Sequence, residues 1–299
     1  MKSDDHGWGA MRSELVCSGV RFGEGPVWCG DDTLVVTSVA DGALIRVEVG
    51  SGRTSRFAET GGGANGAALA ADGSMLVTQN GGIDFSQLGL FAEPPEYRPA
   101  TPGLQVARPD GTVTYLADEG FLAPNDLAVH ADGRVFFTDP PHHPPPPEAV
   151  GRVMVLERDG TISTLAAGFH YCNGIAFTPD GVVVVVERRG LQAVAHDGTR
   201  EWVIETLGDG GGDGFCYDVD GRAYVASTNE HGIRVLDPDG TVVEFLPIEG
   251  EGLTTNCCFG GADLRTLFAT DALPGNVVAF EGMPTPGLPL PPWPGLADT

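Results

Sequence analysis

The stretch NDLAVHADGRVFFTD (residues 125–139) decides the fold of this chain. It begins with the polar Asn125, continues through a short apolar run and reaches Asp132 and Gly133, a residue pair that is typical of tight turns. The run VFFTD that follows is rich in β-branched and aromatic residues, which favour strands. The stretch therefore predicts a strand that begins at a polar residue, a tight turn and a second, antiparallel strand.

The same pattern occurs six times along the chain. In every copy an oxygen-bearing side chain precedes an aspartate by seven residues. The six pairs are Glu24 and Asp31, Asn65 and Asp72, Asn125 and Asp132, Asn173 and Asp180, Asp213 and Asp220, and Asn256 and Asp263. Because the interval does not vary, six copies of one supersecondary unit place six polar groups at one structural position. The first member of each pair is called a ring residue below.

A third β-rich run follows the second in the repeats, and in four of them another tight turn comes after it. Four segments place Asp-Gly between β-rich runs, namely RPDGTVTYL (108–116), ERDGTISTL (157–165), AHDGTREWVI (195–204) and DPDGTVVEFL (237–246). An Asp-Gly pair between such runs is a strong signal for a hairpin. Each repeat is therefore predicted to be a four-stranded antiparallel meander.

These repeats predict the fold. Units of about 40 to 50 residues with four strands each are typical of propeller blades. Six of them fill the chain, so we expect an all-β protein, a six-bladed β-propeller of four-stranded antiparallel blades. The sixth repeat (255–282) holds three predicted strands, whereas SELVCSGV (13–20) is an apolar run without a blade. We expect this N-terminal strand to complete the last blade, because closure removes an exposed sheet edge.

The repeats leave room for one domain. We predict a single propeller over residues 12–282, an N-terminal extension over 1–11 and a Pro/Gly-rich C-terminal tail over 283–299. The composition of the tail is compatible with an extended strap or with a disordered end.

Composition limits the partners. The net charge of −24 would repel the phosphates of nucleic acid and of an anionic membrane, so we expect neither as a partner. No apolar run approaches the roughly 18 residues of a membrane span, and the first residues lack the core of a signal peptide. The six cysteines lack CxxC spacing, which favours buried thiols in a reducing compartment. We therefore predict a cytoplasmic protein with a small-molecule substrate, and monomer and dimer both remain open.

The ring residues suggest a metal site. The first strand of each blade should lie beside the central channel, so that the ring residues surround the channel at one face. The candidate ligands are the carboxylates and amides of Glu24, Asn125, Asn173 and Asp213. Oxygen ligands with two negative charges suit Ca²⁺, with other divalent cations as possible substitutes. The alternative is that these side chains satisfy turn backbone and that water fills the channel.

Two long loops return to the same face. Residues 80–103 and 139–151 connect the second and third strands of repeats two and three, and we expect them to form pocket walls or a lid. His142, His143 and His231 lie in loops of this face and could transfer protons, although exposed loop histidines commonly have no role. The candidate substrate-binding residues are Asn65, Phe85, Phe121, Asn125, His142, His143, Tyr171, His231 and Asn256.

Several motifs together resemble one family. FGEGPVW (22–28), APNDLAVHADGRVFFTDP (123–140), CNGIAFTPDG (172–181), DGFCYDVDGRAYVA (213–226) and TTNCCFGGADLRTLFATD (254–271) carry the resemblance. They resemble the calcium-dependent propellers of the gluconolactonase and regucalcin group, also called the senescence-marker-protein family. The similarity extends from about residue 22 to residue 280 and implies the same propeller fold.

The resemblance also implies roles for individual residues. It assigns Glu24, Asn173 and Asp213 as calcium ligands and places Asn125 at or near the metal, facing the substrate. The same pattern of oxygens is similar to that of fluorophosphatase propellers, which cleave phosphotriesters, and of related lactonases. One position departs from the regucalcin-like members, which carry a sugar-contacting arginine where this chain has Ala123. A less polar lactone is therefore as compatible with the predicted pocket as a sugar lactone.

The expected activity follows from the resemblance and from the ligand chemistry. We expect a calcium-dependent hydrolase that opens a lactone, with Asp213 as the general base that activates water. Hydrolysis of a phosphotriester or aryl ester at the same ion is one alternative. A metal-assisted enzyme without hydrolytic activity, or a binding protein, is another.

Overall fold

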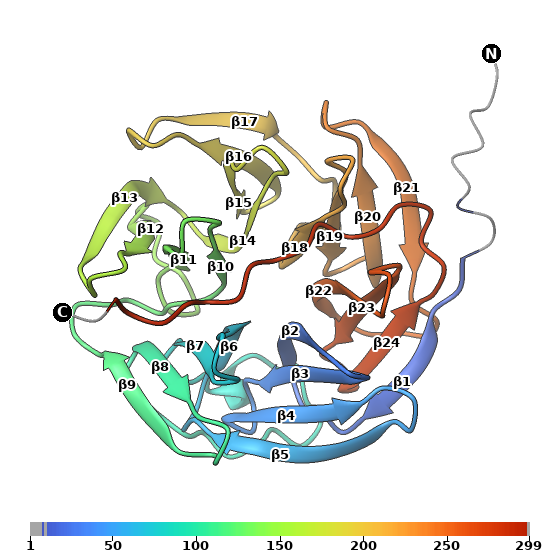
Figure 1. Cartoon of the computed structure of the whole chain (residues 1–299), viewed down its shortest axis with the longest axis horizontal. Helices are drawn as coiled ribbons and strands as arrows, with labels where there is room; N and C mark the ends of the chain where they lie inside the picture. Colours follow the sequence, from blue (N-terminus) through green and yellow to red (C-terminus); the bar gives the residue numbers. More distant parts are fainter. Residues whose placement is uncertain (1–7, 9–10, 298–299) are drawn as a thin grey trace.

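The protein is a six-bladed β-propeller. The computed structural model describes residue 8 and residues 11–297, and its strands form six four-stranded antiparallel sheets. Figure 1 shows the six sheets arranged around a central axis. Within the described residues the only helix is a single 3₁₀ turn, η1 (Phe85–Gln87), and none is long and apolar enough to cross a membrane. The predicted fold class is confirmed.

Each blade is a meander whose first strand is innermost. Blade 1 contains β2 (Gly23–Gly30), β3 (Thr33–Ser38), β4 (Ala43–Glu48) and β5 (Arg53–Glu59). Blade 2 contains β6 (Ala64–Leu69), β7 (Met75–Gln79), β8 (Gly103–Ala107) and β9 (Val113–Ala117). Blade 3 contains β10 (Leu127–Val129), β11 (Val135–Asp139), β12 (Gly151–Leu156) and β13 (Ile162–Phe169).

The second half of the chain repeats this arrangement. Blade 4 contains β14 (Cys172–Phe177), β15 (Val183–Glu187), β16 (Gly190–Val194) and β17 (Arg200–Ile204). Blade 5 contains β18 (Phe215–Tyr217), β19 (Ala223–Ser227), β20 (Gly232–Leu236) and β21 (Val242–Pro247). Blade 6 contains β22 (Thr254–Gly260), β23 (Thr266–Asp271) and β24 (Asn276–Phe280), and β1 (Glu14–Ser18) is its outermost strand.

The N-terminal strand closes the ring as predicted. β1 pairs with β24 in an antiparallel register that places Leu15 opposite Val278. The first and last parts of the propeller are thereby joined in one sheet, so that blade 6 has the same four strands as the other blades.

The apolar core lies between the blades. Six clusters of buried side chains each join two neighbouring blades. Aromatic residues four positions after a ring residue belong to these interfaces. Trp28 of blade 1 stacks on Phe268 of blade 6 with ring centroids 5.7 Å apart, and Phe177 of blade 4 contacts the edge of Phe136 of blade 3 at 5.2 Å. These residues pack the ring and do not face its channel.

The C-terminal tail forms a strap across the propeller. Figure 1 shows this segment running across the open end of the ring, from blade 6 past blade 5 to the opposite side. Its backbone N–H groups at Leu288 and Trp293 donate to the carbonyls of Tyr217 and Leu69, at 2.9 and 2.8 Å. Trp293 is buried in the cluster between blades 2 and 3. Residues 283–297 therefore form an extended strap. This is one of the two alternatives, an extended strap or a disordered end, that the composition of the tail allowed.

The predicted N-terminal extension, residues 1–11, lies outside the described residues except for Trp8 and Met11. Trp8 is buried and its ring lies 5.9 Å from that of Tyr224.

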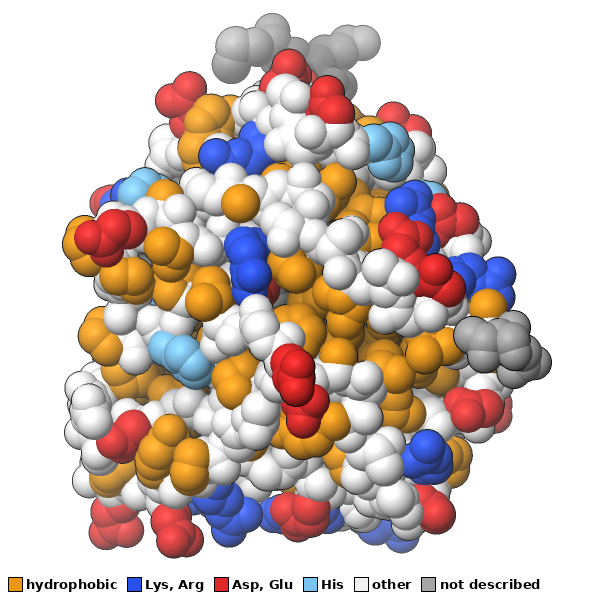
Figure 2. Space-filling view, turned by 90° about the vertical axis from the view of Figure 1, so that its left-hand side faces the viewer, with side chains coloured by type: hydrophobic (Ala, Val, Ile, Leu, Met, Phe, Trp, Pro, Cys, Tyr) orange, Lys and Arg blue, Asp and Glu red, His pale blue; other side chains and the backbone are white. Residues whose placement is uncertain are grey.

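Charged side chains are dispersed over the surface that is visible in Figure 2. On this side of the ring, where β13 lies, acidic and basic side chains alternate with apolar and uncharged ones. The predictions that exclude nucleic acid and membrane partners rest on the net charge of the sequence and stay predictions.

Candidate functional site

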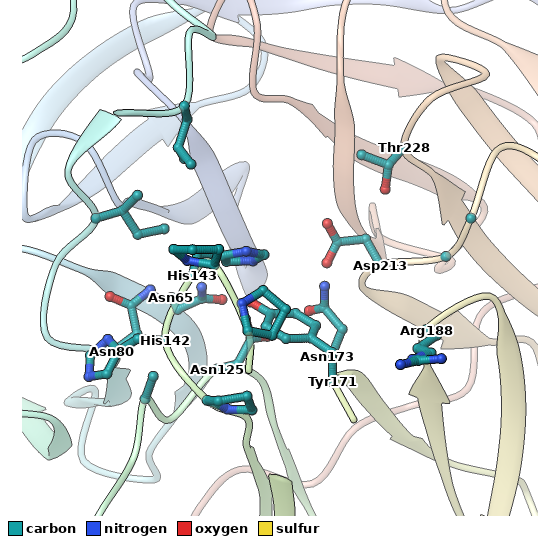
Figure 3. Close-up of a pocket in the computed structure, with 18 of the residues that line it drawn as sticks. Asn65, Asn80, Asn125, His142, His143, Tyr171, Asn173, Arg188, Asp213 and Thr228 are labelled. Atoms are coloured by element: carbon teal, nitrogen blue, oxygen red, sulfur yellow. The ribbon is translucent and has the colours of Figure 1, made fainter. Parts of the chain in front are cut away.

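A large pocket lies over the channel at the face opposite the strap. It has a volume of about 1530 Å³ and is lined by the starts of the first strands and by loops above them. The loops between β7 and β8 and between β11 and β12 contribute a large part of its wall. Both long loops thus border the site, as the sequence indicated, and Figure 3 shows His142 and His143 of the second loop beside the central polar groups.

Five of the six ring residues line this pocket. They are Glu24, Asn65, Asn125, Asn173 and Asp213. The sixth, Asn256, is buried beside them, and its Nδ2 donates to Oε2 of Glu24 at 3.3 Å and to Oδ2 of Asp126 at 3.5 Å. The ring residues, which precede an aspartate by seven residues in the sequence, therefore occupy equivalent positions in the six blades around the axis.

Glycine allows the ring residues to approach one another. Four ring residues are followed by glycine, and a Cβ at each of these glycines would meet the ring residue of the next blade or its neighbour. At Gly214 the added carbon would lie 2.1 Å from Cγ of Asn256, and at Gly174 it would lie 2.3 Å from the backbone oxygen of Asp213. Only a residue without a side chain fits such an approach.

Threonine hydroxyls connect neighbouring blades at the same level. The hydroxyls of Thr37 and Thr138 donate to the backbone oxygens of the ring residues Asn65 and Asn173 in the next blade, at 2.5 and 2.7 Å. Thr78 donates in the same way to Asn125. Because each of these threonines is fully buried, water does not compete for these hydrogen bonds. The bonds therefore fix the position of the ring residues along the propeller axis.

Acidic side chains at the ends of second strands anchor the segments that precede the ring residues. Oδ1 of Asp139 accepts hydrogen bonds from the backbone N–H groups of Leu122 and Ala123, both at 2.9 Å. The two carboxylate oxygens of Glu187 accept from His170 and Tyr171 at 2.8 and 3.2 Å. These bonds fix the approach of the chain to Asn125 and Asn173.

Three carboxylates share the centre of the site, of which Glu24 and Asp126 are buried and Asp213 is half-buried. Burial, and the nearby charge of Asp126, raise the pKa of Glu24 to about 8. Burial followed by the charges of Glu24 and Asp126 raises the pKa of Asp213 well above its usual value. Burial also raises the pKa of Asp126 to about 6. No Lys or Arg of the described residues forms an ion pair with any of the three.

The donor atoms fit a hard divalent cation. Uncompensated buried carboxylates are costly, and a bound cation would supply the missing positive charge. Oδ1 of Asn65 is buried without a hydrogen-bond partner among the described residues, which leaves a further oxygen available. In the described part of the chain no group of three or more His, Cys, Asp and Glu side chains has the spacing of a metal site. A cation here would therefore depend on amide oxygens as well as carboxylates, a combination that suits Ca²⁺ better than Zn²⁺.

Asp126 was not predicted from the sequence. It follows the ring residue Asn125 at the position that four other blades fill with glycine. The aspartate in place of glycine is the sequence signal that distinguishes this position. Its carboxylate is directed toward Asn256 and its charge raises the pKa of Glu24, so Asp126 belongs to the site.

The other candidate residues fall into two groups. Tyr171, His142 and His143 line the pocket, and the rings of His143 and Tyr171 lie 4.6 Å apart. Desolvation, and the neighbouring His142, lower the pKa of His143, which favours the neutral form of this imidazole.

Phe85, Phe121 and His231 are not among the residues that line the pocket. Phe85 is buried beneath the blade 2 loop, where its ring contacts Phe22 at 4.8 Å. Phe121 packs on Phe137, with ring centroids 6.0 Å apart. Both serve the packing of loops against the blades.

His231 holds blade 5 to blade 6. Its Nε2 lies 3.1 Å from Oδ1 of Asp271, and its Nδ1 lies 3.3 Å from the backbone oxygen of Gly250. Because both ring nitrogens have partners and the side chain is buried, His231 has no free nitrogen to present to a substrate.

The pocket has further lining residues that no pattern in the sequence indicates. Arg188 and Arg189, in the turn between β15 and β16, line the pocket, as do Tyr97 of the blade 2 loop and Trp202 of β17. A long loop is the sequence feature that indicates a pocket wall, and the two-residue turn of Arg188 and Arg189 lacks this feature.

Known proteins with similar sequences cover most of this chain. The gluconolactonase of Zymomonas mobilis is 24% identical over 85% of this chain and 77% of that protein. The pentonolactonase XacC of Haloferax volcanii is 28% identical over 87% of this chain and 84% of that protein.

A solved structure gives the same result. The gluconolactonase of Xanthomonas campestris is 25% identical and superposes with a TM-score of 0.73 over 92% of this chain and 91% of that one. Residues 22–272 match the family described as "SMP-30/Gluconolactonase/LRE-like region". Together with the six-bladed fold and the ring of oxygens, this match confirms the resemblance found in the sequence, and the chain belongs to the SMP-30/gluconolactonase/LRE-like family.

Proposed function

We propose that this protein is a calcium-dependent hydrolase that opens a lactone. The observation that carries the proposal is a group of three carboxylates and three amide oxygens over the channel, without a basic ion-pair partner among the described residues. Two of the carboxylates are buried and the third, Asp213, is half-buried. Relatives that are named lactonases, similar over three quarters or more of both chains, support this activity. Glu24, Asn125, Asn173 and Asp213 would hold the ion, and Asn65 and Asp126 lie beside them.

The chain's own residues then have distinct tasks. When bound, Ca²⁺ supplies positive charge that polarises the ester carbonyl and stabilises the oxyanion formed on attack. Asp213 accepts a proton from the attacking water and returns it to the ring oxygen when the C–O bond of the lactone breaks. Asn65 and Asn125 are placed to orient the substrate by hydrogen bonds, because their amides face the same pocket.

Lactone hydrolysis measured with and without calcium tests this function. We expect proton release from a panel of five- and six-membered lactones to stop in excess EDTA and to return when CaCl₂ is added. Turnover of aryl esters or phosphotriesters, with none of any lactone, would replace the lactonase by the alternative hydrolase. Calcium binding without turnover of any of these substrates would contradict a hydrolase.

Glu24→Gln is expected to weaken calcium binding by at least about tenfold, because it removes one of two ligand charges and keeps the size of the side chain. Isothermal titration calorimetry with CaCl₂ measures the dissociation constant directly. Glu14→Gln is the matched control, since Glu14 is exposed on the outermost strand β1. An unchanged dissociation constant in Glu24→Gln would remove Glu24 from the ligand set.

The stability of the metal-free protein should depend on pH in an unusual direction. The raised pKa values of Glu24 and Asp213 mean that the folded state binds more protons than the unfolded state between pH 6.5 and 8. The free energy of unfolding therefore falls as the pH rises through this window. The lowered pKa of His143 opposes this trend at the lower end of the window, because the unfolded imidazole still binds part of a proton near pH 6.5, and the opposition fades toward pH 8.

Urea denaturation at pH 6.5, 7.2 and 8.0 measures this slope. In EDTA the midpoint should decrease with pH, whereas saturating CaCl₂, which binds the ionised carboxylates, should remove or reverse the decrease. Parallel curves in EDTA and in calcium would show that the carboxylates do not bind the ion.

The compartment also belongs to this proposal. All six cysteines are free, and Cys216 and Cys257 remain unbonded although their Sγ atoms lie 3.7 Å apart. This arrangement fits a reducing environment such as the cytoplasm.

A further inference from the structure

Two arginines enter the candidate site from blade 4. Arg188 and Arg189 form the two-residue turn between β15 and β16, in which Glu187 pairs with Gly190. The backbone N–H of Arg188 donates to the backbone oxygen of Tyr171 at 3.2 Å. This bond ties the turn to the segment that leads into the ring residue Asn173. Both arginines line the pocket, and Figure 3 shows Arg188 on the side of Tyr171 and Asp213, away from Asn80 and His142.

The fold itself gives no reason for an arginine at position 188. Its φ is 56°, a conformation in which asparagine or glycine is favoured in such hairpin turns. Among the described residues its guanidinium takes part in no ion pair, no side-chain hydrogen bond and no contact with an aromatic face. The carboxylate of the adjacent Glu187 is hydrogen-bonded to the backbone N–H groups of His170 and Tyr171 and forms no ion pair with Arg188.

Arg189 is only weakly engaged. Its Nη1 lies 3.7 Å from Oδ1 of Asp209, and both side chains are largely exposed. Exposed pairs at this distance contribute little, so Asp209 is easily displaced by a ligand. Both guanidinium groups are therefore available to the pocket.

These arginines stand out against the charge of the molecule. The chain has 17 basic and 41 acidic residues, and the pocket contains several carboxylates. Arg188 and Arg189 are the only Lys or Arg side chains among the described residues that line it. A negatively charged ligand would be repelled by the rest of the surface and attracted at this turn. Guanidinium groups bind carboxylate, sulfonate and phosphate with paired hydrogen bonds.

Arg188 and the central polar groups open onto one pocket. The turn of Arg188 is hydrogen-bonded to Tyr171, two residues before the ring residue Asn173. Arg188, Asn173 and Asp213 all line the pocket. One molecule could thus present its carbonyl to Asp213 and Asn173 and a charged substituent to Arg188.

We infer that Arg188, assisted by Arg189, forms an anion subsite, and that the preferred substrate is a lactone with a carboxylate, sulfonate or phosphate remote from its carbonyl. The inference rests on the proposed lactonase function and adds the substrate class to it. The subsite lies on blade 4 and is separate from Ala123 of blade 3, where the side chain has no charge.

Matched substrates test the subsite. A δ-lactone with a terminal hydroxymethyl group is compared with the same ring carrying a terminal carboxylate, sulfonate or phosphate. We expect the wild-type kcat/KM to be at least about tenfold higher for one or more of the anionic lactones. Arg188→Gln should lower kcat/KM for these lactones about 10- to 100-fold, the range for a hydrogen bond to a charged group, and change the neutral one less than threefold. The preference should also decrease between 50 and 500 mM NaCl.

Arg56→Gln is the matched control. It removes the same charge from the outer strand β5, and it should leave every value unchanged. The inference is overturned if the wild type does not prefer any anionic lactone, or if Arg188→Gln lowers kcat/KM equally for neutral and anionic substrates.

A binding measurement separates this inference from the proposed function. Tetrahydropyran rings with a carboxylate or a hydroxymethyl substituent lack the ester and are not hydrolysed. Calorimetry should detect tighter binding of the carboxylate, and Arg188→Gln should abolish the difference. If no lactone is hydrolysed but this difference is found, the subsite stands and the lactonase function fails. If lactones are hydrolysed and the difference is absent, the lactonase stands and the subsite is refuted.

Discussion

Asp213→Asn is expected to lower kcat for lactone hydrolysis by about 10²- to 10⁴-fold, the contribution of a well-placed general base. The substitution keeps the size of the side chain and one oxygen for the cation, but its amide cannot accept a proton from water. Asp213 is half-buried in the pocket, and its pKa is raised by desolvation as well as by the nearby charges of Glu24 and Asp126. Calcium binding should therefore weaken and persist, while turnover at saturating calcium is lost.

Steady-state kinetics in saturating CaCl₂, together with calorimetry, distinguish loss of the base from loss of the metal. Asp118→Asn is the control, because Asp118 is exposed just beyond the outer strand β9. If Asp213→Asn retains full kcat at saturating calcium, another group removes the proton and the assignment of Asp213 fails. Asp126 would then be the next residue to replace, because it is the third carboxylate of the site.

Trp293→Ala is expected to lower the free energy of unfolding by about 3 to 5 kcal/mol, the usual cost of truncating a buried aromatic side chain. Trp293 is only 5% exposed, and it packs between blades 2 and 3 at the end of the strap. Its backbone also pairs with Leu69. Loss of the indole should leave a cavity and loosen the strap from the propeller.

Urea denaturation of the calcium-saturated protein measures this effect, and Leu290→Ala is the control. Leu290 belongs to the same strap but is 69% exposed, so its truncation should change the free energy of unfolding by less than about 0.5 kcal/mol. Hydrolytic kcat of folded Trp293→Ala should stay near the wild-type value, because the strap and the pocket lie at opposite ends of the channel. Equal midpoints for the two variants would show that the strap does not stabilise the ring.

The fold could be predicted because its determinants recur. The seven-residue interval fixes the length of each first hairpin, and six copies specify the ring and the position of Glu24, Asn173 and Asp213 within it. Closure by β1 followed from counting strands in the last repeat. These features depend on positions along strands, which a sequence pattern records directly.

Side-chain direction outside the strands was harder to predict. Phe85 and Phe121 lie in loops of the site face, but their rings are buried because burying apolar area there is favourable. His231 was assigned to the same face, and its partner Asp271 lies 40 positions away in the sequence, where no local signal connects the two. No loop-length signal marks Arg188, because the turn that carries it has only two residues. Contacts between residues far apart in the sequence decide the placements of Phe85, Phe121 and His231, and a single sequence does not record them.

The glycines that follow the ring residues have a consequence for how such a protein can change. Because main-chain atoms at Gly174 and Gly214 lie close to the next blade, the width of the ring of oxygens is set by the backbone and is insensitive to most substitutions elsewhere. The surrounding turns, including the one that carries Arg188, can exchange residues without altering that width. New ligand preferences can therefore evolve at the rim while the ring of oxygens retains its dimensions.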